Sequence, residues 1–185
     1  MAKKGYIYKG LKTVYWCPHC ETALAEAEIE YKDDKSFSIY VKFKSVDLNC
    51  HMPKGADPDK VFALIWTTTP WTIPCNVAIS ANENFEYVWV RIGAEYLLMA
   101  KALVEPTMKA GKFEDYELLP DVMTGKQLEG LVFKHPFYDR KVPIILGDHV
   151  TLEAGTGLVH TAPDHGQDDF YDCMIYGAWG LIELG

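Results

Sequence analysis

Hydrophobic and polar side chains alternate along residues 36–46, SFSIYVKFKSV, and this period of two predicts a half-buried strand. The apolar face of that strand would carry Phe37, Ile39, Val41 and Phe43. Residues 61–66, VFALIW, are instead continuously apolar, which predicts a central strand buried on both faces. The two patterns place strands in two different environments of one sheet.

Turn residues divide the rest of the chain into short elements. Further strands are predicted at residues 77–80, 85–92, 96–99, 130–134, 143–146 and 158–161. Helices are predicted at residues 21–31, at residues 100–111 and from Gln167 to about Ala178, and residues 120–130 are predicted to be a loop. The expected fold class is therefore α+β: a strand-rich, barrel-like domain with a few peripheral helices.

Composition and charge narrow the function classes. With 185 residues, 49% of them hydrophobic, the chain suits a globular domain, and no apolar run approaches the roughly 20 residues of a membrane span. We expect a cytoplasmic monomer without membrane contact. Residues 1–60 hold ten Lys and nine acids, whereas residues 61–185 hold eight Lys or Arg and seventeen acids. Binding nucleic acid mainly through non-specific phosphate contacts would require the opposite balance.

The five cysteines are an odd number without a regular framework, so structural disulfides are not expected. Cys17 and Cys20 form a Cys-Pro-His-Cys segment that leaves two alternatives open. A thiol-disulfide oxidoreductase would need a buried strand before Cys17 and a helix after it, but the preceding residues are rich in Gly and Lys. A non-catalytic nucleic-acid-binding module with a zinc ribbon would need about two more ligands, usually a second Cys-x-x-Cys, which is absent.

The stretch WTTTPWTIPCN, residues 66–76, places hydroxyls and two prolines at the end of the predicted central strand. A purely structural interpretation treats the β-branched threonines as strand residues and the prolines as a strand stop. Three consecutive threonines must however face both sides of a sheet, and Pro70 and Pro74 prevent regular pairing. The functional alternative is a cleft lined by hydroxyls and backbone carbonyls.

The stretch GTGLVHTAPDHGQDDF, residues 155–170, combines a glycine turn, a strand with a histidine, and an Asp pair at a helix start. Glycines allow close backbone approach, and histidine with carboxylates can bind an amine, a hydroxyl or a metal. The structural alternative is that His160 is a satisfied core histidine and Asp168 a helix cap.

Together, the Thr-rich strand end and the His-Thr-Ala-Pro segment resemble the two halves of the hydrolytic pocket in the editing domain of isoleucyl-tRNA synthetases. VYWCPHCETALAEAEIEY, LGDHVTLEAGTG and HPFYDRKVP extend the resemblance over essentially the whole chain. Valyl and leucyl editing domains are less similar, since Thr69 and Trp71 stand in place of the Arg and the acid in their pattern. Asp164 departs from the family pattern, which has Gly there. The aminoacylation signatures His-Ile-Gly-His and Lys-Met-Ser-Lys-Ser are absent from these residues.

The resemblance implies an aminoacyl-tRNA ester hydrolase that removes valine from tRNA(Ile), or from valyl-adenylate, and excludes isoleucine by pocket size. The implied catalytic residues are Thr67, Thr68, Thr69, Asn76 and Asp169. The implied substrate-binding residues are Trp71, Thr72, His160, Thr161, His165 and Asp168. Asp169 would bind the substrate's ammonium group and His160 would wall the side-chain pocket. Water would attack directly, with no covalent intermediate, no cofactor and no metal in the pocket.

The resemblance also implies how the chain is organised and what it binds. Residues 1–35 would be a junction segment with an orphan half of a zinc ribbon, and residues 36–185 would be the editing domain. The second zinc ligand pair would lie outside this chain, so Cys17 and Cys20 alone should bind zinc weakly or not at all. The expected partners are the acceptor end of tRNA(Ile) carrying valine, valyl-adenylate and the remainder of the synthetase.

Overall fold

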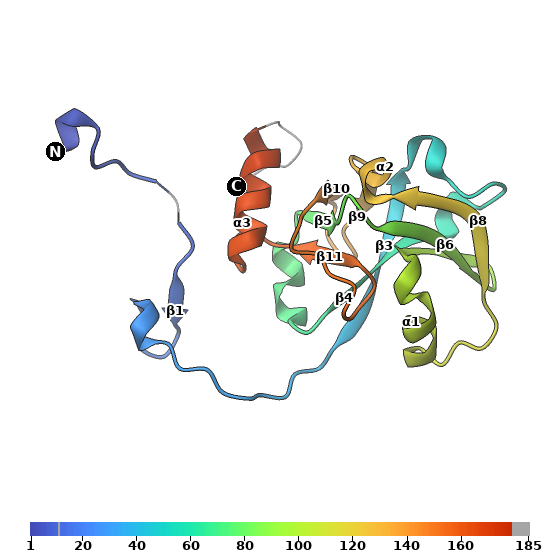
Figure 1. Ribbon diagram of the computed structural model, residues 1–185, viewed down its shortest axis with the longest axis horizontal. Helices are drawn as coiled ribbons and strands as arrows, with labels where there is room; N and C mark the ends of the chain where they lie inside the picture. Colours follow the sequence, from blue (N-terminus) through green and yellow to red (C-terminus); the bar gives the residue numbers. More distant parts are fainter. Residues whose placement is uncertain (11, 179–185) are drawn as a thin grey trace. The chain divides into compact units, whose positions relative to one another are not determined.

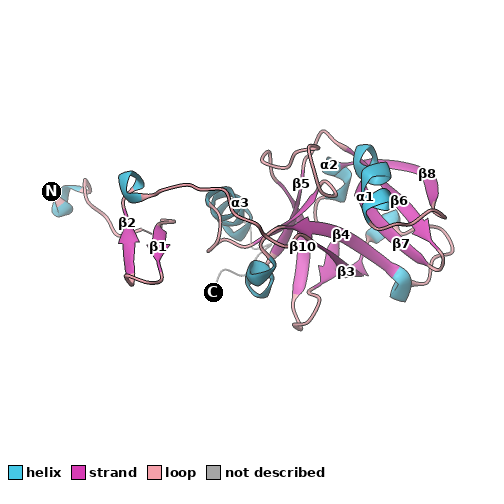
Figure 2. Cartoon of the chain, turned by 90° about the horizontal axis from the view of Figure 1, so that it is seen from below, coloured by secondary structure: helices cyan, strands magenta, loops and turns pink. Residues whose placement is uncertain are grey.

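The computed structural model describes residues 1–10 and 12–178, and the chain divides into two compact units, Met1–Lys35 and Ser36–Gly185. The smaller unit contains, in order, η1 (Ala2–Lys4), β1 (Tyr15–Cys17), β2 (Thr22–Leu24) and η2 (Glu26–Glu28). Strands β1 and β2 pair as an antiparallel hairpin, which Figure 2 shows in magenta. The two thiols of Cys17 and Cys20 therefore lie at a hairpin turn.

The predicted helix at residues 21–31 is wrong, because this stretch forms β2 and the single 3-10 turn η2. Ala and Glu favour a helix by only a few tenths of a kcal/mol per residue over ordinary residues. A helix of about ten residues is marginal in water unless one face packs against another element. None of the described residues within 21–31 is buried, so no tertiary packing supports a helix there.

Nine strands of the larger unit form one mixed sheet in the order β11-β5-β10-β9-β3-β4-β7-β6-β8. These strands are β3 (Ile39–Asp47), β4 (Val61–Thr67), β5 (Ala78–Ala81), β6 (Glu86–Ile92), β7 (Glu95–Ala100), β8 (Glu117–Thr124), β9 (Val132–Lys134), β10 (Lys141–Leu146) and β11 (Leu158–Thr161). The pairs β4–β7 and β5–β10 are parallel, and the other neighbours are antiparallel. Strand β11 contacts β4 across the curled sheet, but β8 and β11 do not pair within the described residues. The α+β class is confirmed, and the barrel-like curl stays open.

The helices of the larger unit are short and lie around the sheet, as Figure 1 shows for α1, α2 and α3. They are α1 (Val104–Ala110), α2 (Gly125–Leu128) and α3 (Gln167–Ala178), with the 3-10 turns η3 (Asn49–His51), η4 (Pro58–Lys60), η5 (Pro70–Cys75) and η6 (Lys101–Leu103). The helices predicted at residues 100–111 and from Gln167 are confirmed. Among the described residues, no helix is long and apolar enough to cross a membrane.

Both faces of β4 and β6 are largely buried, which explains their continuous apolar sequences. In β6, Tyr87 and Trp89 join the main core enclosed by the curled sheet. Val88 and Val90, on the opposite face, pack with Met108 of α1 in a second core. A third, smaller core packs α3 against β5 and β10. The prediction that residues 61–66 form a central strand is confirmed, since β4 lies between β3 and β7.

The predicted loop at residues 120–130 is wrong, because β8 extends to Thr124 and α2 follows it. Pro120 suggested a loop, since proline cannot donate a hydrogen bond to a sheet ladder. Strand β8 is however the last strand of the sheet, and its register with β6 shifts between Val88 and Val90. An irregular edge strand tolerates proline, so the chain continues as a strand through this residue.

The start of β11 is held by a buried tyrosine hydroxyl. Tyr87 donates to the Gly157 carbonyl at 2.8 Å and accepts from the Asn82 amide at 3.0 Å. Gly157 has a φ of 71°, and a Cβ there would lie 2.4 Å from the Ala100 Cβ, so this close approach requires glycine. Strand β11, which carries His160, is thereby fixed at its first residues.

Tyr87→Phe should lower the free energy of unfolding by about 1–3 kcal/mol, because it leaves a buried carbonyl and a buried amide without their partner. Chemical denaturation of the purified chain measures this value. Tyr40→Phe is the matched control, since Tyr40 lies on the exposed face of β3. An equal loss of stability in both variants would contradict the role of the Tyr87 hydroxyl.

Candidate functional site

The two stretches singled out from the sequence lie side by side at one end of the sheet. The Thr-rich stretch leaves β4 at Thr67 and turns through η5, a 3-10 helix with Pro70 at its start and Pro74 inside it. Immediately after η5, the Val77 amide donates to the Thr161 carbonyl at the end of β11 at 3.0 Å. This backbone contact joins residues that are 84 positions apart in the sequence.

A chain of threonine hydroxyls ends at the ring of His160. The Thr67 and Thr69 Oγ1 atoms are 3.2 Å apart, and Thr69 Oγ1 is 3.4 Å from Thr72 Oγ1. Thr72 Oγ1 is in turn 2.9 Å from His160 Nε2. The Thr67, Thr72 and His160 side chains are buried, whereas Thr69 between them is exposed, so this polar chain connects the surface of the protein to a buried ring.

The donors and acceptors in this chain define the tautomer of His160. Thr72 Oγ1 donates its one proton to the Thr69 carbonyl at 2.8 Å, so it must accept from His160 Nε2. His160 Nδ1 is then an acceptor, and it is buried without a hydrogen-bond partner in the described part of the chain. Burial, reinforced by the charges of His165 and His135, lowers the pKa of His160 to about 4. The imidazole is therefore neutral near pH 7.

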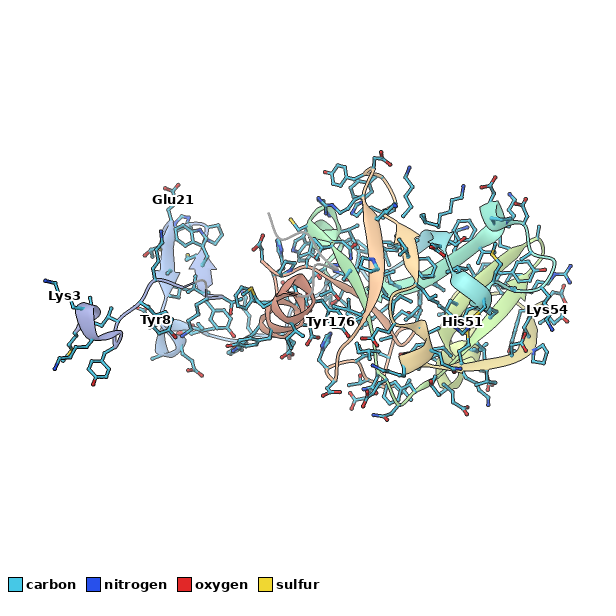
Figure 3. All side chains as sticks on the ribbon, turned by 90° about the horizontal axis from the view of Figure 1, so that it is seen from above. Lys3, Tyr8, Glu21, His51, Lys54 and Tyr176 are labelled. Atoms are coloured by element: carbon cyan, nitrogen blue, oxygen red, sulfur yellow. The ribbon has the colours of Figure 1, made fainter. Side chains whose placement is uncertain are left out.

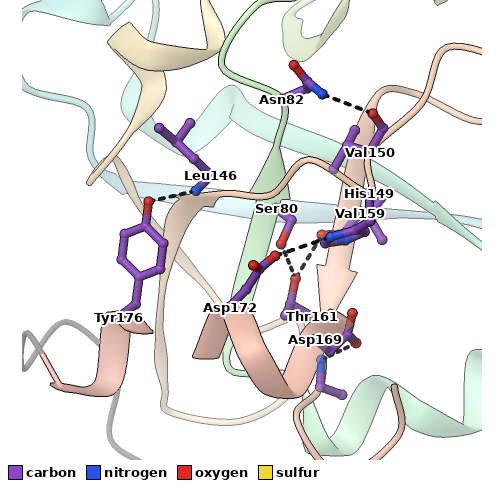
Figure 4. Close-up of polar contacts among 11 residues, drawn as sticks. Ser80, Asn82, Leu146, His149, Val150, Val159, Thr161, Asp169, Asp172 and Tyr176 are labelled. Carbon is purple, nitrogen blue, oxygen red and sulfur yellow. Dashed lines mark hydrogen bonds and ion pairs between the residues drawn. The ribbon is translucent and has the colours of Figure 1, made fainter. Parts of the chain in front are cut away.

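Asp169 lies in the first turn of α3 and is fixed by the backbone next to His160. Its Oδ2 accepts from the Ala162 amide at 2.9 Å, as Figure 4 shows. Burial raises the pKa of Asp169, although the Ala162 amide and the charge of His149 act in the opposite direction. A half-buried carboxylate whose ionised form is penalised is suited to accept a cationic partner.

The other predicted residues fall into buried and exposed groups. Thr161 is fully buried, and its hydroxyl is 2.6 Å from Ser80 Oγ. Asn76 is also fully buried, and it donates from Nδ2 to the Ala78 carbonyl at 2.7 Å, whereas its Oδ1 is buried and has no hydrogen-bond partner among the described residues. The exposed residues are Thr68, Trp71, His165 and Asp168. Of the predicted set, the structure joins Thr67, Thr69, Thr72 and His160 by direct hydrogen bonds.

No role was predicted from the sequence for the residues that attach α3, the helix carrying Asp169, to the rest of the domain. His149 Nδ1 lies 3.2 Å from Asp172 Oδ2, one turn along α3 from the site. Tyr176, labelled in Figure 3, accepts from the Leu146 amide at 3.0 Å and donates to Glu129 Oε1 at 2.8 Å. These bonds fix the buried side of α3. A cluster of acids on one face of a predicted helix is the only sequence signal for them.

The Cys17 and Cys20 thiols lie at the turn between β1 and β2. The Cys20 amide donates to Cys17 Sγ at 3.4 Å, and backbone hydrogen bonds from Cys20 and His19 lower the pKa of Cys17. The hydrogen bond and the charge of Cys17 raise the pKa of Cys20, so only one of the two thiols is favoured as a thiolate. Within the described residues no group of three His, Cys, Asp or Glu side chains could hold a metal ion, so the donor set does not complete a structural zinc site.

The geometry agrees with a family match over most of the chain. The family described as tRNA synthetases class I (I, L, M and V) matches residues 1–164. The chain belongs to this class I tRNA synthetase family. The resemblance to isoleucyl-tRNA synthetases is confirmed by relatives within the family. An isoleucine–tRNA ligase of Caldicellulosiruptor bescii is 57% identical over 100% of this chain and 20% of its own length. One of Brevibacillus brevis is 55% identical over 92% of this chain and 18% of its own length.

The class I synthetase chain thus spans about a fifth of the length of the curated relatives it matches. Solved structures agree in fold. The editing domain of the cytosolic leucyl-tRNA synthetase of P. knowlesi superposes with a TM-score of 0.61 at 14% identity, covering 80% of this chain and 66% of that one. GlLeuRS-CP1 superposes with a TM-score of 0.61 at 16% identity, covering 78% and 63%. At these sequence identities, the comparison shows that the folds are similar and nothing more.

The purified chain should bind Zn²⁺ weakly, because two thiolates leave two of the four tetrahedral positions to water. Zinc titration with a competing chromophoric chelator measures the affinity, and Cys17→Ser with Cys20→Ser is the matched control. Tight binding at one zinc per chain, lost in the double variant, would show that the chain supplies a complete site.

Proposed function

We propose that the larger unit hydrolyses the ester that joins valine to tRNA(Ile), and that it acts as the editing domain of an isoleucyl-tRNA synthetase. The smaller unit would be the junction segment that precedes it. The partners would be the acceptor end of the charged tRNA and the remainder of the synthetase, and valyl-adenylate is a second substrate with the same aminoacyl group.

One observation supports this proposal above the others. The hydroxyl chain that starts at Thr67 ends at His160, and the carboxylate of Asp169 is bonded to the backbone two residues beyond it. A neutral imidazole, aligned hydroxyls and a half-buried carboxylate suit an aminoacyl ester, whose ammonium needs a carboxylate partner and whose carbonyl needs neutral hydrogen-bond donors.

The chemistry follows from the reactivity of the substrate. An aminoacyl ester is already activated, so water positioned against its carbonyl suffices, and no nucleophilic side chain has to form a covalent intermediate. Asp169 would hold the ammonium and thereby orient the ester. The Thr67, Thr68 and Thr69 hydroxyls, with Asn76, would position the terminal adenosine and the attacking water.

Selectivity would depend on the size of the pocket beside His160. Isoleucine exceeds valine by one methylene, which is worth about 1–3 kcal/mol in a single hydrophobic pocket. A second site that admits valine and rejects isoleucine by steric exclusion multiplies that discrimination. His160 is suited to form a wall, since hydrogen bonding to Thr72 fixes its ring and its exposed fraction is 6%.

Asp169→Asn should lower the rate of valyl-tRNA(Ile) deacylation by about 10- to 100-fold, which corresponds to the loss of one charge-assisted hydrogen bond. The asparagine Oδ1 can still accept from the Ala162 amide, so the variant removes the charge and keeps the structural bond. Release of labelled valine measures the rate. Asp121→Asn, on the exposed side of β8, controls for the change in net charge. Near-normal hydrolysis by Asp169→Asn would refute the proposed ammonium site.

His160→Ala should allow the domain to hydrolyse correctly charged isoleucyl-tRNA(Ile), because the wall that excludes the extra methylene is gone. His160→Phe keeps a ring of similar bulk without the nitrogen donor, and it should still discriminate. The ratio of the two deacylation rates, valyl over isoleucyl, measures the effect, and we expect it to fall by about 10-fold or more in the alanine variant only. An unchanged ratio in His160→Ala would contradict the proposal that His160 excludes isoleucine from the pocket.

A further inference from the structure

The helix η5, which places Thr72 against His160, has few bonds of its own. It is six residues long, two of them are prolines without an amide proton, and its N-cap residue Thr69 makes no side-chain cap bond. Hydrogen bonds from the Thr72 amide to the Thr69 carbonyl and from the Asn76 amide to the Ile73 carbonyl close its two ends. Such a segment requires outside support to keep one geometry.

The support comes from the turn between β9 and β10, residues 135–140. His135 Nε2 lies 2.9 Å from the Ile73 carbonyl. Arg140 Nη1 donates to the Pro74 carbonyl at 3.3 Å and also to the Asn76 carbonyl. Two side chains of one turn therefore bind three backbone carbonyls at the C-terminal end of η5, two within it and one at its C-cap, and the first of these carbonyls belongs to the residue after Thr72.

The tautomer of His135 is determined by its own turn. Its Nδ1 accepts from the Tyr138 amide at 3.1 Å and from the Phe137 amide at 3.4 Å, so the ring proton resides on Nε2 and is donated to Ile73. The ring stacks on Tyr138 with centroids 4.9 Å apart, and its exposed fraction is 2%. Burial lowers the pKa of His135, although the bond to Ile73 opposes this effect, and the neutral donor form persists near pH 7.

From these contacts we infer that His135 and Arg140 are positioning residues for the hydrolysis: they clamp η5 so that the Thr72 hydroxyl meets His160. They touch neither the hydroxyl chain nor His160 by any hydrogen bond within the described residues, and act through the backbone of η5. This inference rests on the proposed function of the same site. It gives His135 and Arg140, the first and last residues of the HPFYDR segment, a role in the hydrolysis.

Two substitutions separate the clamp from a purely structural role in the turn. His135→Gln can place an amide donor near the position of Nε2 and keep the bond to Ile73, but it loses the acceptor for the turn amides. His135→Asn can place an acceptor near the position of Nδ1 and keep the turn, but it loses the donor to Ile73. The clamp requires the glutamine variant to be the more active of the two.

We expect kcat for valyl-tRNA(Ile) deacylation to fall by about 10- to 100-fold in His135→Asn with KM changed less than about threefold, because a displacement of reacting groups by about 1 Å has this effect on the chemical step. His135→Gln should stay within about threefold of the unaltered chain. Asp139→Asn, in the same turn with a fully exposed side chain, is the matched control and should leave both constants unchanged. Unaltered kcat in His135→Asn, or an equal loss in both His135 variants, would overturn the inference.

A spectroscopic measurement keeps this inference distinct from the proposed function. If the unaltered chain fails to hydrolyse valyl-tRNA(Ile), the proposed function fails, and the clamp is tested by the ¹H–¹⁵N signals of the Thr72 amide and the His160 ring. These signals should shift in His135→Asn and stay in place in His135→Gln. Unchanged signals in His135→Asn would show that η5 keeps its geometry without the clamp.

Discussion

The hydrogen bond between Thr72 and His160 is the interaction on which the site depends. It spans 2.9 Å in space and 88 residues in sequence, and it joins the short helix after β4 to the strand β11. Neither segment holds this position by itself. Tyr87 fixes the start of β11, the Val77 amide pairs with its end, and the β9–β10 turn supports η5 from the other side. The sheet order alone would keep these elements apart, and the curl of the sheet, which brings β11 against β4, places them at one site.

Burial gives this hydrogen bond its chemical character. Burial lowers the pKa of His160, so its imidazole stays neutral, and burial raises the pKa of Asp169, so its ionised form is disfavoured. Burial is the largest cause of both pKa shifts. A site of this kind offers neutral polar groups and a half-buried carboxylate, and it therefore suits a substrate with one positive charge and a polar, uncharged reacting group.

The pattern of hydrophobic residues predicted most of the strands, because alternation and continuous apolar runs can both be read within a short stretch of sequence. The alternation at residues 36–46 predicted β3, although the strand begins only at Ile39 and Phe37, expected on the apolar face, is 87% exposed. The apolar run at residues 61–66 corresponds to β4, which is buried on both faces. The predictions at residues 21–31 and 120–130 are wrong for a shared reason. Helix propensity in the first stretch and Pro120 in the second are weak preferences, and the pairing of neighbouring strands decided the outcome in both.

The candidate site was predictable as a set of residue types and less so as an arrangement. The Thr-rich stretch and the His-Thr-Ala-Pro segment pointed to the two halves that the structure brings together. Their partners His135 and Arg140 had no signal of their own, because a side chain that binds distant carbonyls leaves no periodic pattern. The sequence also could not show that Thr161 bonds to Ser80 inside the sheet, because this contact depends on the pairing of β11 with β5, which neither strand's own pattern specifies.

The most direct test of the account is a structure of the chain with a non-hydrolysable valyl amide analogue of the terminal adenosine. The account predicts that the analogue's ammonium nitrogen lies about 3 Å from a carboxylate oxygen of Asp169 and that its isopropyl group packs against the ring of His160. Binding of the analogue away from Asp169 and His160, with the hydroxyl chain of η5 untouched, would contradict the assignment of this site.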